Sequence, residues 1–278
     1  TLVHLGDVVD RRKFINHNTA HNFKKVFWNK LEELNIDTHI IIGNHDTYYK
    51  NTNEVNALQN LNISKDAKIY TRATTVNFGG LDILFLPWIC DDNYDDSLYA
   101  IDNSTTTIAM GHLEVKGFEM HKGHFNDQGL EKTQFNKFEK VLSGHFHKKS
   151  DDGRIYYLGT QYEITWSDYK CPKGFHIFDT DTRELERVPN PIRMYKKLYY
   201  NDKETDYSDF DITPFNNTNV KIFVTNKTDE NPSTNYNVFI VDQALKNSSS
   251  VSLMNTNMIN SNLNSNVMGV FTKLYNTK

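Results

Sequence analysis

The sequence has little of what marks several protein classes. It contains only two cysteines, Cys90 and Cys171, and they form no CxxC pair. Neither a disulfide framework nor a zinc–thiolate site is therefore indicated, and a reduced, intracellular setting fits best. No apolar run approaches the roughly 18 residues that a transmembrane helix needs, so we expect no membrane association.

The sequence also lacks an excess of positive charge. Its 31 Lys and Arg residues face 35 Asp and Glu residues, which gives a net charge of −4. The composition therefore does not indicate the basic surface that is typical of nucleic-acid-binding proteins. Such a function is weakened but not excluded, because bound divalent cations can supply the positive charge that meets a phosphate.

What is present suffices for a large core. The chain has 278 residues, of which 38% are hydrophobic and 13% aromatic, and this length allows one large domain with an appendage or two domains. Apolar runs and helical spacings alternate at first, and hairpin patterns follow, which predicts a mixed α/β layered domain. We expect a helix over 16–34, with Asn16, Asn18 or Thr19 as its N-cap and an apolar face formed by Phe23, Val26, Phe27, Leu31 and Leu34. Further helices are expected over 52–61 and 131–140. Strands are expected over 1–5, 38–42, 67–71, 74–78, 81–86, 105–110, 141–143, 155–159, 174–179, 220–224 and 236–241, with a hairpin turn at 179–183.

The character of the sequence changes near residue 190, where Pro189 and Pro191 mark a boundary. We predict a core over residues 1–190, a smaller unit over 191–245, and an Asn- and Ser-rich tail over 246–278 that is weakly structured or dependent on a partner.

Four apolar runs end in the same way, with a glycine followed by polar side chains. These endings are Gly6-Asp7, Gly43-Asn44-His45-Asp46, Gly111-His112 and Gly144-His145-Phe146-His147. Because the carboxyl ends of strands line the ligand crevice of α/β sheets, residues far apart in sequence can meet there. Imidazole and carboxylate groups are ligands of divalent transition metals, and a carboxylate can bridge two cations. The sequence therefore predicts a dinuclear metal site.

Other polar and aromatic residues allow two interpretations each. His17 and His21 lie four apart on the first predicted helix and fit a solvated helix face better than a metal pair. The basic residues Arg11, Arg12, Lys13, Lys148 and Lys149 could contact DNA phosphates or be a solvated charge run. The aromatic pair Tyr48 and Tyr49 could stack a base or pack at a dimer contact.

The ordered set of motifs GD, GNHD, GH and GHxH resembles that of the calcineurin-like metallophosphoesterases. Within them the chain is most similar to the SbcD-type DNA repair exonucleases and their phage recombination counterparts, with further matches at Arg12-Lys13, Tyr49-Lys50-Asn51, Leu86-Pro87-Trp88, Glu114, Gly117-Phe118, Gly159-Thr160 and Gly174-Phe175. The resemblance implies a four-layer α/β/β/α sandwich with a small C-terminal α+β cap. It also implies a Mn-dependent nuclease acting on DNA ends in repair and recombination, located in the cytoplasm of a bacterial or phage-infected cell. Homodimerisation and an SbcC-type ATPase of the SMC class as partner are implied as well.

The resemblance also assigns roles residue by residue. Asp7 would bridge two divalent ions, expected to be Mn²⁺, while His147 would serve the second ion and His45 would be the catalytic histidine. The first ion would be completed by Asn44, His112 and His145.

The family opens with a further Asp-x-His motif that supplies two ligands to the ion that His147 serves, and we expect this motif to lie before Thr1. We therefore expect the chain as given to bind one ion better than two and to have little nuclease activity unless upstream sequence is restored. Two rival functions remain at this point, namely hydrolysis of small-molecule or phosphoprotein esters, and a scaffold that binds DNA ends without cutting them.

Overall fold

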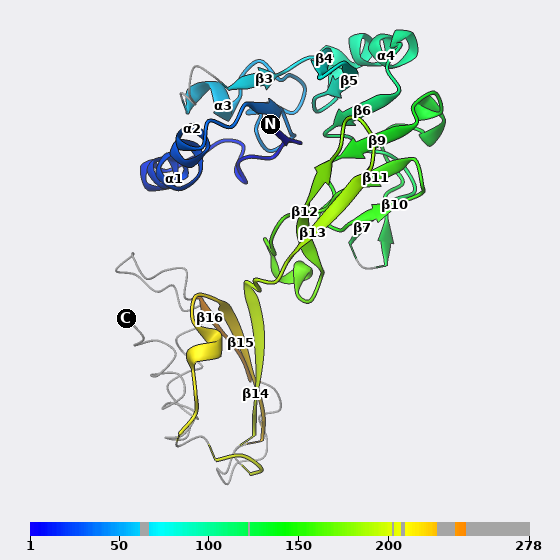
Figure 1. Ribbon diagram of the computed structural model, residues 1–278. Helices are drawn as coiled ribbons and strands as arrows, with labels where there is room; N and C mark the ends of the chain where they lie inside the picture. The colour runs from blue at the N-terminus through cyan, green and yellow to red at the C-terminus, as the bar shows by residue number, and fades with distance from the viewer. Residues whose placement is uncertain (62–66, 122, 202, 207–208, 227–236, 243–278) are drawn as a thin grey trace. The chain divides into compact units, whose positions relative to one another are not determined.

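The computed structural model describes residues 1–61, 67–121, 123–201, 203–206, 209–226 and 237–242 (Figure 1). The chain divides into two compact units. The first holds Thr1–Gln161 and Pro172–Asn190, and the second holds Tyr162–Cys171 and Pro191–Lys278. The predicted tail at 246–278 lies outside the described residues. Within the described ranges, every helix is too short or too polar to cross a membrane.

The first unit contains a parallel three-stranded sheet in the order β1-β2-β3. Its strands are β1 (Leu2–His4), β2 (Thr38–Ile41) and β3 (Lys68–Tyr70). A helical layer lies along this sheet (Figure 1), formed by α1 (His17–Phe23), the π-helical turn η1 (Lys24–Trp28), α2 (Asn29–Glu33) and α3 (Ala57–Asn60). The core between the two layers is formed by Trp28, Ile40, Ile42 and Leu58.

The long helix predicted over 16–34 forms, but its predicted apolar face is partly wrong. Val26 and Leu34 are 69% and 68% exposed, whereas Trp28 is buried. The cause is the π turn at Lys24–Trp28, which adds a residue to one turn and rotates the following side chains around the axis. The remaining predicted residues of that face pack against the core as expected, namely Phe23, Phe27 and Leu31.

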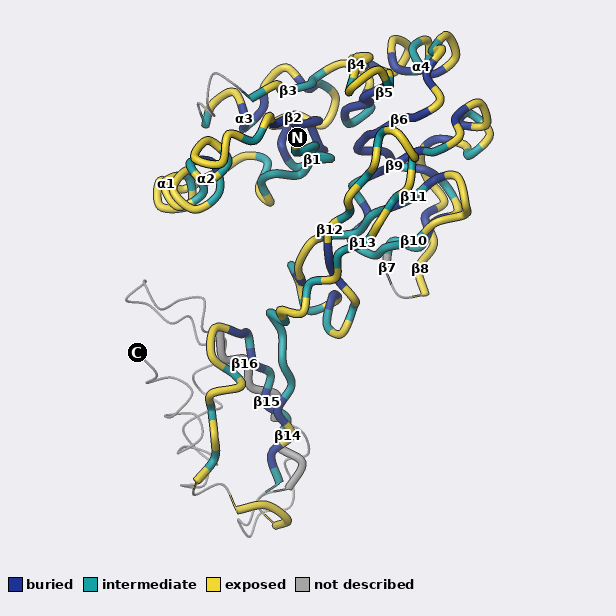
Figure 2. Tube along the Cα trace, in the orientation of Figure 1, coloured by how far each residue is buried: buried dark blue, intermediate teal, exposed yellow. Residues whose placement is uncertain are grey.

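The second sheet has six strands in the order β10-β11-β9-β6-β5-β4. Its strands are β10 (Ser150–Asp151), β11 (Ile155–Tyr157), β9 (Lys140–Ser143), β6 (Ile108–Gly111), β5 (Leu81–Leu86) and β4 (Thr74–Phe78). The four central strands run parallel, and the two edge strands pair antiparallel. Figure 2 shows the central strands of this sheet as buried, as expected for parallel strands covered on both faces.

The side chains of β5 alternate between the two faces of the six-stranded sheet and show what packs on each face. Ile83 and Phe85 join Ile41 of the small sheet in the core between the sheets. Leu84 and Leu86 point the other way and pack with Ile101 of helix α4 (Tyr94–Asn103). Successive side chains on a strand face opposite sides, so the order of layers is helix, sheet, sheet, helix. The predicted α/β fold class with a four-layer α/β/β/α core is confirmed.

The helix predicted over 131–140 is wrong. Only a 3₁₀ turn, η3 (Lys132–Phe135), forms there. Phe135 and Phe138 both reach the outer core, and the backbone N–H of Glu139 then donates to the carbonyl of Thr107, 2.8 Å away. This segment buries two aromatic rings and also leads directly into β9, which pairs with β6. A helix continued to residue 140 would occupy residues that belong to the start of β9.

Two hairpins complete the first unit. One joins β7 (Glu119–His121) to β8 (His124–Phe125), and the other joins β12 (Lys173–Phe178) to β13 (Leu185–Asn190). The turn predicted at 179–183 connects the second pair and places Arg183 at φ +61°. A 3₁₀ turn, η2 (Asp91–Asn93), precedes α4.

The second unit is built on a three-stranded sheet in the order β14-β15-β16. Its strands are β14 (Tyr195–Asn201), β15 (Asn219–Asn226) and β16 (Asn237–Asp242), and its 3₁₀ turns are η4 (Trp166–Asp168) and η5 (Thr213–Phe215). Glu163 ties the two segments of this unit together, because its carboxylate accepts hydrogen bonds from the backbone N–H groups of Met194 and Tyr195.

Candidate metal centre

The Asp7 turn forms where β1 ends, in a backbone conformation that few residues adopt. Gly6 has φ +90° and Asp7 has φ +56°. A Cβ atom on Gly6 would lie 2.4 Å from Nδ1 of His112 and 2.7 Å from Cα of Gly43. Glycine is therefore required at residue 6, because only hydrogen fits between these neighbours.

Asp46 clamps the turn after β1 to the turn after β2. Its carboxylate is fully buried and accepts hydrogen bonds from the backbone N–H groups of Asp7, Val9 and Gly43, at 2.8, 3.1 and 2.8 Å. Burial raises the pKa of Asp46 to about 6, and the Asp7 charge adds to the rise, while the N–H groups of Gly43 and Val9 oppose it. The Asp46 side chain therefore orients Asp7, whereas the side chain that caps the next helix belongs to Asn56.

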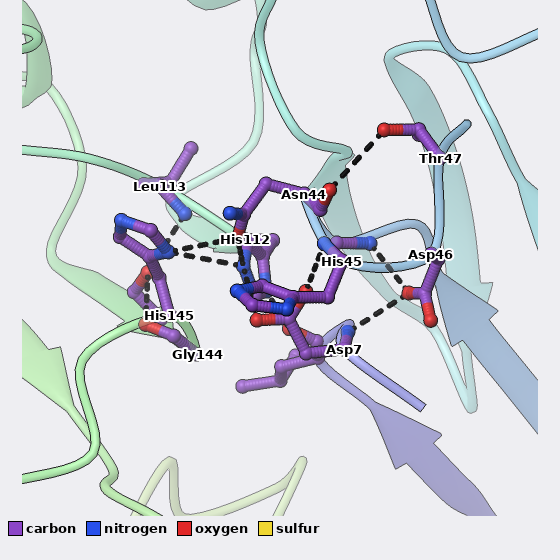
Figure 3. Close-up of polar contacts among 12 residues, drawn as sticks. Asp7, Asn44, His45, Asp46, Thr47, His112, Leu113, Gly144 and His145 are labelled. Atoms are coloured by element: carbon purple, nitrogen blue, oxygen red, sulfur yellow. Dashed lines mark hydrogen bonds and ion pairs between the residues drawn. The ribbon is translucent and has the colours of Figure 1, made fainter. Parts of the chain in front are cut away.

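The ring of His112 is held in one orientation by the first strand. Its Nδ1 lies 2.7 Å from the carbonyl oxygen of Leu5, so Nδ1 carries the proton and Nε2 presents its lone pair to the site. Nε2 lies 2.9 Å from Oδ1 of Asn44, 3.2 Å from Nδ1 of His145 and 3.3 Å from Oδ2 of Asp7. Figure 3 shows these side chains converging from separate strand ends.

Four potential metal-ligand atoms thus lie 2.9–3.3 Å from their neighbours. The ligand atoms of Asp7, His112 and His145 all lie within 4.8 Å of one another, and Oδ1 of Asn44 lies 3.1 Å from Nδ1 of His145. Burial and the charge of His112 lower the pKa of His145 to about 3. Burial would lower the pKa of His112 too, but the Asp7 carboxylate and the Leu5 carbonyl raise it overall.

The pKa of Asp7 is also set by burial and by its neighbours, which act in opposite directions. Burial alone would raise its pKa, yet the His112 imidazole and the backbone N–H of His45, which donates to Oδ1 at 2.7 Å, lower the pKa to about 2. The cluster therefore combines one carboxylate with two imidazole rings and an amide, and this set favours a cation. This mixed nitrogen and oxygen set suits a divalent transition metal.

The amide of Asn44 tests whether the site fits such an ion. With its oxygen toward the cluster, Oδ1 faces only lone pairs, on Asp7, His112 and His145. With the amide rotated, its NH₂ group would lie within 3.3 Å of all three with two N–H bonds to donate, and its oxygen would accept from Nη2 of Arg12 at 3.0 Å. A divalent cation among these atoms would make the oxygen orientation favourable, so the Asn44 side chain fits a metal ligand.

The comparisons with known proteins agree with this donor set. Residues 1–149, more than half of the chain, match the family model described as calcineurin-like phosphoesterase. The chain belongs to the calcineurin-like phosphoesterase family. Members of this family use divalent metals, and residues 211–278 match a domain of unknown function.

Named relatives of this phosphoesterase are nuclease subunits. It is 36% identical over 228 residues to exonuclease subunit 1 of Enterobacteria phage T4, a match covering 81% of this chain and 65% of the phage protein. It is 25% identical over 105 residues to the D subunit of nuclease SbcCD from Staphylococcus saprophyticus, covering 35% and 28%. The matches therefore span less than two thirds of each relative. A solved archaeal phosphodiesterase shares 14% identity over 61% of this chain and 79% of that chain, with a TM-score of 0.31.

His45 of the phosphoesterase is held beside the metal centre and not within it. Its Nδ1 lies 2.6 Å from the carbonyl oxygen of Asp10, so Nδ1–H donates there and Nε2 is the ring atom left to exchange a proton. Its backbone N–H also donates to Asp7. The geometry suits the proton donor that the sequence predicted at this position.

His147 is not brought into this ligand cluster. Its backbone carbonyl accepts hydrogen bonds from Nζ of Lys173, which is 1% exposed, at 2.7 Å and from the N–H of Thr160 at 3.2 Å. The charge of His147 still contributes to the low pKa of His145. Its role at a second ion stays a prediction.

Sequence reasoning from strand endings alone did not single out Leu5, whose carbonyl orients His112, or the packing role of Trp88. The Trp88 ring lies 5.3 Å from the ring of His145 and 6.3 Å from that of His112. A backbone carbonyl carries no sequence signal, whereas Trp88 follows the Leu86-Pro87 pair and could be located only through family resemblance.

Proposed function

We propose that this phosphoesterase is a Mn-dependent exo/endonuclease subunit that hydrolyses phosphodiester bonds of DNA in repair and recombination. The observation that carries the proposal is the convergence of four lone-pair donors, from Asp7, Asn44, His112 and His145, beside a histidine outside the cluster. The named nuclease relatives support a nucleic acid as the substrate class.

The four donors would hold one divalent ion, and His147 together with Asp7 would contribute to a second. Such ions, when bound, neutralise charge on the phosphate and lower the pKa of a coordinated water. His45 then protonates the leaving oxygen from Nε2, because its Nδ1–H is engaged by the Asp10 carbonyl. Asp46 keeps Asp7 in its left-handed backbone conformation throughout.

Arg12 would bind the phosphate. Its Nη1 is buried without a hydrogen-bond partner, and its Nη2 lies 3.0 Å from the Asn44 amide atom that faces away from the cluster. When the Asn44 oxygen faces a cation, this guanidinium group has no acceptor in Asn44. A phosphate oxygen would then satisfy it in the bidentate manner that arginine favours.

The partners proposed for the protein follow from its relatives, which are subunits of nucleases. We infer a homodimer that works with an SbcC-type SMC ATPase in the cytoplasm of a bacterial or phage-infected cell. Residues 191–245 would form a capping domain.

The test compares two substrates under one set of conditions. A 3′-labelled DNA duplex and bis-p-nitrophenyl phosphate are incubated with the protein and Mn²⁺, and the His45→Asn variant is the control. Cleavage of the duplex that depends on Mn²⁺ and on His45 supports the proposal. Hydrolysis of bis-p-nitrophenyl phosphate alone favours a small-molecule phosphoesterase. DNA binding without bound metal or hydrolysis favours an end-binding scaffold.

A further inference from the structure

An exposed pair of tyrosines stands immediately beyond the metal-binding turn that follows β2. Tyr48 and Tyr49 are 39% and 52% exposed, and their rings meet edge to face with centroids 4.7 Å apart at an angle of 75°. They follow the ligand Asn44 by only four and five residues. Two large rings are thus kept in contact with solvent at the margin of the metal centre.

The backbone beneath these rings is fixed by hydrogen bonds. The N–H of Tyr48 donates to the carbonyl of Val55 at 2.8 Å, and Thr47 pairs with Asn56 in an isolated antiparallel bridge. The hydroxyl of Thr47 donates to the carbonyl of Asn44 at 3.2 Å. The tyrosine pair is therefore attached directly to a ligand of the metal centre, and its position is set by the same turn.

Positive charge meets the pair from the turn that follows β1. Nζ of Lys13 lies 5.5 Å from the centroid of the Tyr48 ring, within the range of a cation–π contact. Lys13 is exposed and follows Arg12, which reaches Asn44. The hydrogen bond from His45 to Asp10 holds the two turns together at 2.6 Å. Aromatic surface and ammonium charge thus share one edge of the site.

This combination matches the chemistry of one nucleotide. A base offers a flat π face that stacks on an aromatic ring, and its phosphate offers negative charge to a lysine. Tyr48 already has Lys13 on its ring and Tyr49 against it, so Tyr49 is the ring with more open surface. An apolar surface of a partner protein could also bury both tyrosine rings. It would offer no negative charge to the ammonium group of Lys13, whereas a nucleotide would.

We propose that Tyr49, supported by Tyr48 and Lys13, stacks the base of a nucleotide adjacent to the phosphodiester bond that is cleaved. This subsite rests on the proposed function, because it assumes that a nucleic acid enters the metal centre. It assigns the ring to base stacking, which tolerates any of the bases, and the ammonium group to the neighbouring phosphate.

The test measures binding of fluorescein-labelled single-stranded oligonucleotides to the whole chain, in EDTA and again with Mn²⁺. Tyr49→Leu is expected to raise Kd about tenfold, since one stacked base contributes about 1–3 kcal/mol. Tyr49→Phe keeps the ring and is expected to bind as the unchanged chain does. The matched control is Tyr99→Leu, because Tyr99 is 71% exposed on α4.

A second series of binding measurements removes a base from the oligonucleotide instead of the Tyr49 ring from the protein. One abasic residue is placed at each oligonucleotide position in turn, and the position facing Tyr49 is expected to weaken binding to the unchanged chain but not to the Tyr49→Leu variant. Equal Kd values for Tyr49→Leu and Tyr99→Leu would overturn the subsite. So would a Tyr49→Phe variant as weak as Tyr49→Leu, or an effect of Tyr49→Leu on self-association in sedimentation without an effect on DNA affinity.

The two proposals fail differently. Stacking at Tyr49 without hydrolysis of DNA would contradict the nuclease and leave the subsite supported. Hydrolysis of DNA that is unaffected by Tyr49→Leu would contradict the subsite alone. A chain that binds no oligonucleotide in either condition would contradict both.

Discussion

The Nδ1–H group of His112 donates to the carbonyl oxygen of Leu5, 2.7 Å away, although the two residues are 107 positions apart. This bond joins the end of a strand in the small sheet to the end of a strand in the large one. It decides which ring nitrogen carries the proton, and so turns the lone pair of Nε2 toward Asp7 and Asn44. A second group that fixes a ligand ring in this way is a usual part of a metal site.

Replacing Gly6 with alanine should disrupt the site through a clash. The new Cβ would lie 2.4 Å from Nδ1 of His112 in a backbone with φ +90°. We expect a loss of unfolding free energy of about 2–4 kcal/mol and weaker Mn²⁺ binding. Gly153→Ala is the matched control, since Gly153 has the same φ of +90° and nothing within 4 Å. Equal losses in urea unfolding of both variants would show that backbone strain alone is responsible.

Asp46→Asn should weaken metal binding although Asp46 is not a ligand. The buried carboxylate accepts from the N–H groups of Asp7, Val9 and Gly43, and an amide cannot accept with both of its polar atoms. We expect Mn²⁺ affinity to fall about 10- to 100-fold by isothermal titration calorimetry. Asp10→Asn is the control, because Asp10 is exposed and engages His45 through its backbone carbonyl. An unchanged affinity of the Asp46→Asn variant would contradict the clamp.

The two histidines of the Gly144-His145-Phe146-His147 motif should differ in how strongly their removal weakens metal binding. His145→Ala removes a member of the ligand cluster and should weaken the tighter Mn²⁺ ion about tenfold or more. His147→Ala should leave that ion in place, because His147 lies outside this cluster. Calorimetry of the two variants at matched protein concentration provides the measurement. The assignment is wrong if His147→Ala removes the tighter ion.

Stability should depend on His176 in mild acid. Burial lowers the pKa of His176 from 6.5 to about 4, and the charges of Arg187 and Lys149 contribute to the lowering. Because the pKa in the folded chain lies below that in the unfolded chain, the unfolded chain binds the proton first as the pH falls. The contribution of neutral His176 is therefore complete above pH 6.5 and is lost as the pH falls toward 4.

The check is urea unfolding of the unchanged chain and of His176→Leu between about pH 7 and pH 4. The variant is expected to lose less unfolding free energy over this interval. A proton resonance of the His176 ring that titrates near its ordinary pKa would contradict the expectation.

The strands and the helical cap were accessible to sequence reasoning because their causes are local. Period-two and buried apolar runs predicted the strands of both sheets except the edge strand β10, and Asn16 was among the caps considered for the first helix. Its side chain accepts from the N–H of Thr19 at 2.8 Å. The helix predicted over 131–140 failed because the pairing of β9 with β6 overrode the apolar spacing of Phe135 and Phe138.

The metal-ligand residues were also predictable where the signal is local in the sequence, and features that depend on packing were not. A glycine before each polar residue is a local signal, so the sequence pointed to Asp7, Asn44, His112 and His145, which the structure brings together. The π turn that rotates Trp28 inward and Val26 outward depends on packing against the sheet and has no comparable signal.

By itself, the sequence determined the types of ligand and the strand ends that carry them, because glycine turns and strand periodicity are written into neighbouring residues. Only the tertiary structure decided how the ligands are oriented and that the cluster of Asp7, His112 and His145 does not include His147. It also decided that Tyr48 and Tyr49 stand exposed beside Lys13. The physical reason is that these relationships join separate strand ends and turns through backbone carbonyls and ring contacts, which exist only once both sheets have packed.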